Sequence, residues 1–104
     1  MIVTTSNEIP DEKIEKVLGI VKGNTVRARN IGRDIGAGLK GIVGGEVKTY
    51  TAMTMNARDE AYNRMVNDAI NKKADAIIGV RFTTSMIMQG ASEMLAYGTA
   101  VKFN

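Results

Sequence analysis

The sequence of 104 residues predicts a single α+β domain, residues 1–104, in which a small, mainly antiparallel sheet packs on one long helix and a short glycine-rich helix. Two observations predict this fold class. Apolar residues recur at helical spacing in the middle of the chain, and segments rich in β-branched residues lie on both sides of it. The length suits one domain, and no linker or internal repeat divides it.

Two strands are predicted near the start of the chain. Ile2–Thr5 is a short apolar run that ends before the polar stretch around Pro10. Lys16–Arg29 is rich in β-branched residues and predicts a long strand. Gly19 and Gly23 mark positions where this strand could kink or bulge, because glycine tolerates unusual backbone.

The next stretch predicts a short glycine-rich helix, with Ile31, Ile35, Leu39 and Ile42 on one face. Within it, GAGLKG (36–41) also matches the G-x-G-x-x-G pattern of dinucleotide-binding loops. That function requires free amides in a tight turn, whereas amides inside a helix are already bonded. We therefore expect no dinucleotide and no other cofactor here.

Glu46–Lys73 predicts a long amphipathic helix, because apolar residues form one stripe along it and polar residues the opposite side. Glu46 near its start and Lys72-Lys73 at its end would suit the helix dipole. The stripe comprises Ala57, Ala61, Tyr62, Met65, Val66, Ala69 and Ile70.

Two further strands, Ala74–Thr84 and Glu93–Phe103, are predicted around a loop over residues 85–92 that turns at Gly90. Both faces of these strands carry mostly apolar or small residues, whereas a solvated face should alternate with polar ones. One long helix covers one face only. We therefore expect a homo-oligomer, in which another copy of the chain covers the remainder.

The composition excludes several functional classes. The chain has no Cys and no His, which excludes disulfides, thiolate nucleophiles, His-based triads and zinc hydrolase sites. The acidic residues are scattered, so we expect a protein that is not an enzyme. No signal peptide or spanning segment is visible, which predicts a soluble cytoplasmic protein without membrane contact. Interleaved charges and few aromatic residues argue against nucleic acid as a partner.

Two residue clusters leave alternatives open. Met86, Met88 and Met94 surround the predicted turn, and thioethers there could hold Cu(I) or serve as adaptable contact residues at an interface. The second cluster could gather an anion at a helix start, or it could pair with Asp34, Glu46 or acids across a subunit contact. It comprises Arg27, Arg29, Arg33 and Lys40.

Several motifs together resemble the YbjQ family of small bacterial proteins. They are DIGAGLKGIVGGE, then Tyr50, the pair Ala57-Arg58 with Ala61, ADAIIGV and YGTAV, in this order over nearly the whole chain. The resemblance implies a fold similar to the dodecin subunit, assembled as a ring of five, in a family described as heavy-metal-binding. Four residues of these motifs, together with Arg33, are our candidate ligand-binding residues: Asp34, Glu46, Tyr50 and Arg58.

We thus expect an uncharacterised, non-enzymatic, cytoplasmic homopentamer that binds a small ligand or ion at its subunit contacts. The alternative is a protein that handles a soft heavy-metal cation through methionine side chains. Met86, Met88 and Met94 are the candidate ligands for that alternative.

Overall fold

The computed structural model describes residues 1–28, 42–43 and 46–104, with side chains for 1–28 and 52–104. It confirms the predicted α+β class. The predicted glycine-rich helix lies mostly outside these residues, although its last apolar position, Ile42, belongs to a strand and not to a helix. In chain order the elements are β1 (Ile2–Val3), β2 (Ile14–Ala28), β3 (Ile42–Val43), β4 (Glu46–Val47), α2 (Lys48–Asn71), β5 (Ala76–Met88) and β6 (Ala91–Phe103).

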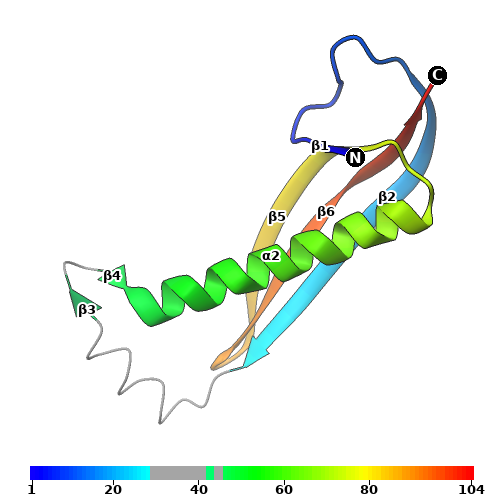
Figure 1. The fold of residues 1–104 in the computed structure, drawn as a ribbon. Helices are drawn as coiled ribbons and strands as arrows, with labels where there is room; N and C mark the ends of the chain where they lie inside the picture. The colour runs from blue at the N-terminus through cyan, green and yellow to red at the C-terminus, as the bar shows by residue number, and fades with distance from the viewer. Residues whose placement is uncertain (29–41, 44–45) are drawn as a thin grey trace.

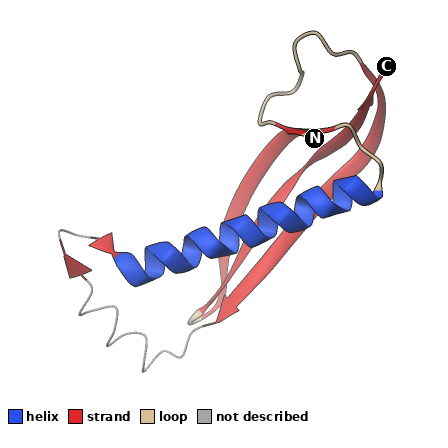
Figure 2. Cartoon of the chain, viewed as in Figure 1, coloured by secondary structure: helices blue, strands red, loops and turns tan. Residues whose placement is uncertain are grey.

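Four strands form one mixed sheet in the order β1-β5-β6-β2. The β5–β6 and β6–β2 pairs are antiparallel, whereas β1 runs parallel to β5. Helix α2 crosses one face of this sheet (Figures 1 and 2) and makes its main contacts with β2 and β6. β3 and β4 pair with each other as a separate two-stranded sheet beside the start of α2.

Helix α2 is seated on β2 at Gly23. A Cβ atom at this position would overlap the carbonyl oxygen of Ala61 and the amide nitrogen of Met65, so only glycine lets the two backbones approach this closely. The bulge predicted in this strand is confirmed at Gly19, where φ is +114° and the register with β6 shifts. At Gly23, by contrast, the pairing with β6 is regular, so the kink considered there is wrong.

The core between α2 and the sheet is built from small residues, which explains the close approach. Ala57, Ala61, Met65 and Ala69 are buried on the helix side. This stripe is narrower than predicted, because Tyr62 and Ile70 are exposed. Across the interface the sheet supplies Val21, Ile77, Val80, Met94, Ala96 and Ala100.

The helix ends differ from the prediction. Glu46 belongs to β4, so no acidic residue lies in the first turn of α2. Lys72 and Lys73 lie beyond the end of α2, and Lys73 takes a positive φ of 61° as the chain turns toward β5. The proposed match to the helix dipole is therefore wrong at both ends.

The last two strands are longer than predicted. β5 continues to Met88 and β6 begins at Ala91, so the expected loop over residues 85–92 is mostly strand. Only Gln89 and Gly90 form the turn, and Gly90 has the positive φ, 80°, that a tight hairpin requires. Alternating side chains of residues 82–88 therefore belong to the two faces of a sheet.

The face of the sheet opposite α2 has a mixed character. Pairing of Lys22, Tyr97 and Arg81 in one row places aromatic and basic side chains there together. Ile20 and Val26, also on this face of β2, are exposed. The prediction of two largely apolar faces is thus only partly right. No helix within the described residues is long and apolar enough to cross a membrane.

Candidate functional site

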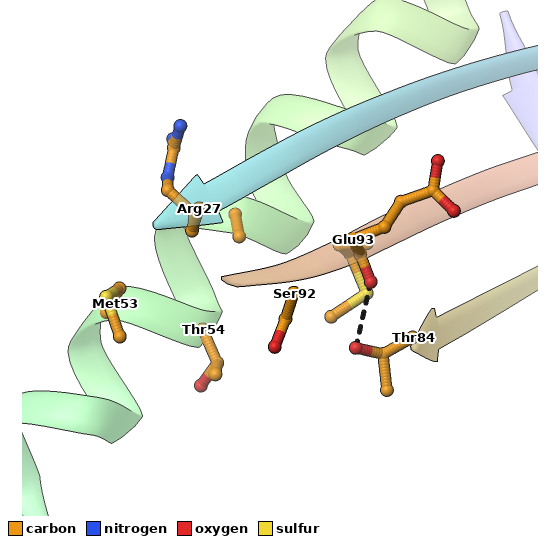
Figure 3. A pocket seen from close by; sticks show the side chains of 8 residues that line it. Arg27, Met53, Thr54, Thr84, Ser92 and Glu93 are labelled. Carbon is orange, nitrogen blue, oxygen red and sulfur yellow. Dashed lines mark hydrogen bonds between the residues drawn. The ribbon is translucent and has the colours of Figure 1, made fainter. Parts of the chain in front are cut away.

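A cavity of about 270 Å³ lies between the N-terminal half of α2 and the turn end of the sheet. Figure 3 shows side chains from α2, β2, β5 and β6 around it. The helix rests on the sheet from Ala57 onward and leaves this space beside its preceding turn. The lining residues are Arg27, Met53, Thr54, Ala57, Thr84, Ser92, Glu93 and Met94.

The lining combines an apolar floor with hydroxyl groups. Ala57 and Met94 are buried and Met53 is half-buried. The Thr84 hydroxyl donates a hydrogen bond of 3.0 Å to the carbonyl oxygen of Glu93, and Ser92 adds a second hydroxyl to the lining (Figure 3). A cavity lined in this way suits a small uncharged molecule that has an apolar body and one polar group.

The charged residues near the cavity are engaged elsewhere. Arg27 donates a hydrogen bond to Glu60 on α2, and Arg64, one turn further along the helix, pairs with the same carboxylate. The hydrogen bond from Arg27 is the main cause that lowers the pKa of Glu60 below its usual value, and the charges of both arginines add to it. Of the two alternatives for Arg27, the structure shows pairing with an acid.

Side chains of α2 also cover the outer edge of β2. The backbone amide of Lys22 donates to Asp68 Oδ2 at 3.2 Å, and Arg64 Nη1 donates to the carbonyl oxygen of Asn24 at 2.6 Å. Both main-chain groups therefore point away from β6, toward the free side of the strand. The helix thus supplies partners that a neighbouring strand would otherwise supply.

The three candidate methionine ligands do not share one face of the hairpin. Met86 pairs with Ser92, and Met94 lies two residues further along β6, so both are on the α2 face. Met88 pairs with Ala91 after a register shift and lies on the opposite face. Met86 and Met88 are 75% and 65% exposed, whereas Met94 is buried. The register therefore separates the Met88 thioether from the other two.

The donor set also does not fit a heavy-metal ion in other respects. Thiolate and imidazole are the usual ligands of soft and borderline cations, and the sequence contains neither Cys nor His. Within the part of the chain that the structure describes, no group of three acidic residues converges on a point. No step of chemistry can be assigned to a bound metal from these residues.

Most of the other candidate residues lie outside the described residues, at least in their side chains. Arg33 and Asp34 are outside the described residues, and so are the side chains of Glu46 and Tyr50, whose backbones lie in β4 and α2. Arg58 is exposed on α2. The hydroxyls of Thr84 and Ser92 were missed, because a loop was expected where the two strands bring them together.

Comparison with known proteins identifies close relatives. A UPF0145 protein from Methanoculleus marisnigri is 61% identical over 102 residues, which cover 98% of this chain and 95% of that protein. A UPF0145 protein from Shewanella frigidimarina is 58% identical over the same shares of both chains. A third, from Archaeoglobus fulgidus, is 55% identical over 98% of this chain and 94% of that protein.

A solved structure shares the fold. The crystal structure of a protein of unknown function of the DUF74 family, from Pediococcus pentosaceus, aligns with a TM-score of 0.67 at 18% identity. The alignment covers 100% of this chain and 98% of that one. The YbjQ family model, described as "Putative heavy-metal-binding", matches residues 1–104. The chain therefore belongs to the YbjQ family, also named UPF0145.

Proposed function

We propose that this protein is a non-catalytic homo-oligomer, assembled as a ring of five, that binds a small uncharged ligand in the cavity between α2 and the sheet. The observation that carries the proposal is the cavity itself, with its floor of Met53, Ala57 and Met94 and its hydroxyl groups of Thr84 and Ser92. Such a lining can hold and orient a molecule, because apolar contacts supply affinity and a few polar groups supply specificity.

The chemistry of the lining supports binding over catalysis. A general acid or base near neutral pH needs a pKa close to the working pH, and the chain has no His or Cys, the side chains whose ordinary pKa values lie nearest to it. The nearby carboxylate of Glu60 is shifted in the opposite direction, since Arg27 holds its pKa low and keeps it ionised. The Thr84 hydroxyl donates to a carbonyl oxygen and not to a basic side chain that could activate it.

The exposed apolar side chains near the cavity support assembly. Met86, Ile87 and Met88 at the turn end of the sheet are all more than half exposed. Clustered apolar groups of this kind mark contact sites in soluble proteins. Thr84 and Met86 lie two residues apart on the same face of β5, and Thr84 lines the cavity. A contact at this end would therefore lie beside the cavity. The ligand would then sit close to a subunit boundary.

Methyl NMR of methionine-labelled protein tests the ligand site. Benzyl alcohol serves as an uncharged probe with an apolar body and one hydroxyl, and benzoate serves as its charged counterpart. We expect benzyl alcohol to shift the methyl signals of Met53 and Met94, because both line the cavity. The Met65 signal should not move, because that side chain is fully buried in the core. Equal shifts at all methionines, or stronger shifts with benzoate, would contradict the proposal.

A filled cavity provides the matched control. Ser92→Phe places an aromatic ring at the half-buried wall of the cavity, so the Met53 and Met94 shifts should be lost. Ser85→Phe adds the same ring to an exposed position on the other face of the sheet and should leave the shifts unchanged. Sedimentation equilibrium at micromolar concentration tests assembly, and a species of 11.2 kDa would refute it.

A further inference from the structure

A second cavity lies on the same face of the sheet as the cavity described above. It has a volume of about 150 Å³ and is more open to solvent than the first. Its lining comes from the N-terminal segment, α2 and β5, and comprises Val3, Thr4, Thr5, Tyr62, Val80 and Phe82. None of these described lining residues is charged. Phe82 pairs with Ala96, a residue of the core under α2, which places the second cavity on the helix side of β5.

The two cavities follow each other along the side of α2 that lies nearer to β5. On β5, Thr84 lines the first cavity, and Phe82, two residues away on the same strand face, lines the second. On α2, Ala57 lines the first cavity and Tyr62 the second, about 7.5 Å further along the helix axis. Phe82 is 47% exposed, so described residues leave much of its ring uncovered where the cavities approach each other. One ligand can therefore reach both cavities.

The two cavities together reach the size of a typical ligand pocket, which neither reaches alone. Such pockets have volumes of at least about 300 Å³. The first cavity has about 270 Å³ and the second about 150 Å³. From Thr84 to Val80 the strand extends about 13 Å, and from Thr54 to Tyr62 the helix extends about 12 Å. The combined site is long, so it suits an extended ligand better than a compact one.

The first cavity holds the groups that suit the polar end of a ligand. The Thr84 hydroxyl donates to a carbonyl oxygen, and its own oxygen remains able to accept a hydrogen bond. The two charged residues of the lining already have partners. Arg27 pairs with Glu60, and the Glu93 carboxylate accepts a hydrogen bond of 3.1 Å from Asn24. An uncharged hydroxyl group therefore fits this end better than a charged group.

The second cavity suits an apolar end. The Thr4 hydroxyl is hydrogen-bonded to the Ser6 hydroxyl at 2.9 Å. The carbonyl oxygen of Thr5 accepts a hydrogen bond of 3.0 Å from Arg81. Polar groups of the N-terminal segment are thus engaged within the protein, and Phe82 supplies apolar surface beside them. Methylene groups that move from water onto such a surface gain free energy.

We infer that the two cavities form one elongated site for an uncharged single-chain amphiphile with one hydroxyl group and about ten carbon atoms. The hydroxyl lies beside Thr84 in the first cavity, and the chain passes Phe82 to reach Val80 in the second. A chain of this length spans about 12 Å, because carbon–carbon bonds of about 1.5 Å advance somewhat less per atom in a zigzag. The inference rests on the proposed ligand site and names the class of its ligand.

Straight-chain primary alcohols, each kept below its solubility limit, test the length of the site. Affinity is measured from the Met53 and Met94 methyl signals. It should rise about threefold with each added methylene group up to about ten carbon atoms and then level off. If it stops rising at about five carbon atoms, the elongated site is overturned and the proposed ligand site stands. If neither methionine responds to any alcohol, both are overturned.

Valine methyl signals of the unaltered protein locate the chain. 1-Decanol should shift the signals of Val3 and Val80, whereas benzyl alcohol, which reaches the first cavity only, should not. Val26 is exposed on the opposite face of the sheet and serves as the control, whose signal should not move with either compound. Shifts of Val26 as large as those of Val80 would show nonspecific partitioning onto apolar surface and would overturn the inference.

A matched pair of substitutions fills the second cavity and spares the first. Thr5→Phe places a ring at an exposed lining position of the second cavity. The affinity for 1-decanol should fall at least about tenfold, and the affinity for 1-butanol should not change. Thr83→Phe adds the same ring at an exposed position on the other face of the sheet and should change neither affinity. An unchanged affinity for 1-decanol in Thr5→Phe, or an equal loss in both variants, is incompatible with the elongated site.

Discussion

At the β2 edge of the sheet, α2 lies over the strand and supplies partners to its main chain, whereas no described residue does so for the outer half of β5. Asp68 and Arg64 bond to Lys22 and Asn24 on one side of the molecule. On the other side, the N-terminal segment ends its pairing at Val80. The same sheet thus has a closed edge, at which the helix bonds two main-chain groups of β2, and an open edge, at which no described residue bonds the main chain of β5 beyond Val80.

This difference between the two edges shows that the position of α2 determines which part of the sheet surface remains exposed. Gly23 lets α2 sit directly on β2, close enough for helix side chains to reach the strand edge. The helix makes few contacts with β5 as a consequence. β5 therefore keeps an exposed apolar surface and main-chain groups to which no described residue bonds.

The largest expected effect follows from moving the helix off its seat. Gly23→Ala places a methyl group against the backbone of Ala61 and Met65, which no side-chain rotation can relieve. We expect the free energy of unfolding to fall by about 3 kcal/mol, at the upper end for overpacked sites. Urea denaturation at a fixed protein concentration measures this loss.

Gly98→Ala is the matched comparison. A Cβ there would lie 2.7 Å from Ile77 Cγ2, 3.0 Å from Val80 Cγ2 and 3.1 Å from the carbonyl oxygen of Ile78. The closest contacts are therefore with side chains and not with a helix backbone. The loss should be smaller, about 1–2 kcal/mol, because side chains relax more readily. If Gly98→Ala proved the more damaging change, close backbone contact at Gly23 would not be what positions α2.

The contact of α2 with Gly23 also shows what could not be predicted from the sequence. The richness in β-branched residues predicted β2, and helical spacing predicted α2. The sequence gives no sign, however, that Gly23 is a contact point and not a bulge, because both roles require the same missing side chain. Only the packed structure distinguishes Gly23 from Gly19.

The candidate site was predictable to a smaller degree. A loop was expected over residues 85–92, so Thr84 and Ser92 could not be placed on facing strands. Threonine and serine are common on strands and in turns, and their presence signals no particular site. Arg27 was recognised as a residue needing a partner, but its partner Glu60 lies 33 positions away and belongs to another element. Such long-range pairs depend on how the helix packs on the sheet, which the sequence alone does not determine.

A smaller effect is expected from uncapping the closed edge. Asp68→Ala removes the acceptor of the Lys22 amide, and water can partly replace it at this exposed position. We expect a loss of about 1 kcal/mol in unfolding free energy, together with stronger self-association through the newly available β2 edge. Asn67→Ala, at a neighbouring exposed position of α2, is the control and should change neither quantity. An unchanged association constant in Asp68→Ala would mean that the carboxylate does not guard this edge.

A pH-dependent effect is expected at the same edge. The hydrogen bond from Arg27 lowers the folded-state pKa of Glu60. Ionised Glu60 therefore stabilises the fold at pH values above its unfolded-state pKa of 4.5. That contribution is lost as the pH falls through the lower, folded-state pKa. The stability difference between the unaltered protein and Glu60→Gln should therefore be present at pH 6 and shrink below pH 4.5. A difference that stayed constant down to pH 3 would show that Glu60 gains nothing from its ionised form.

The smallest expected effect is that of metal ions on the open edge. Met86 and Met88 lie on opposite faces of β5, so within one chain their thioethers cannot close on one ion together with Met94. We therefore expect equilibrium dialysis against Cu(I) to show no stoichiometric uptake. Met86→Leu keeps the apolar volume and should preserve the proposed oligomer. Met86→Lys adds a charge to the edge and should weaken self-association. Stoichiometric Cu(I) uptake that Met86→Leu abolishes would contradict this expectation. It would mean that methionines at the open edge of two chains bind one metal ion together, and that the main role of these side chains is to bind metal.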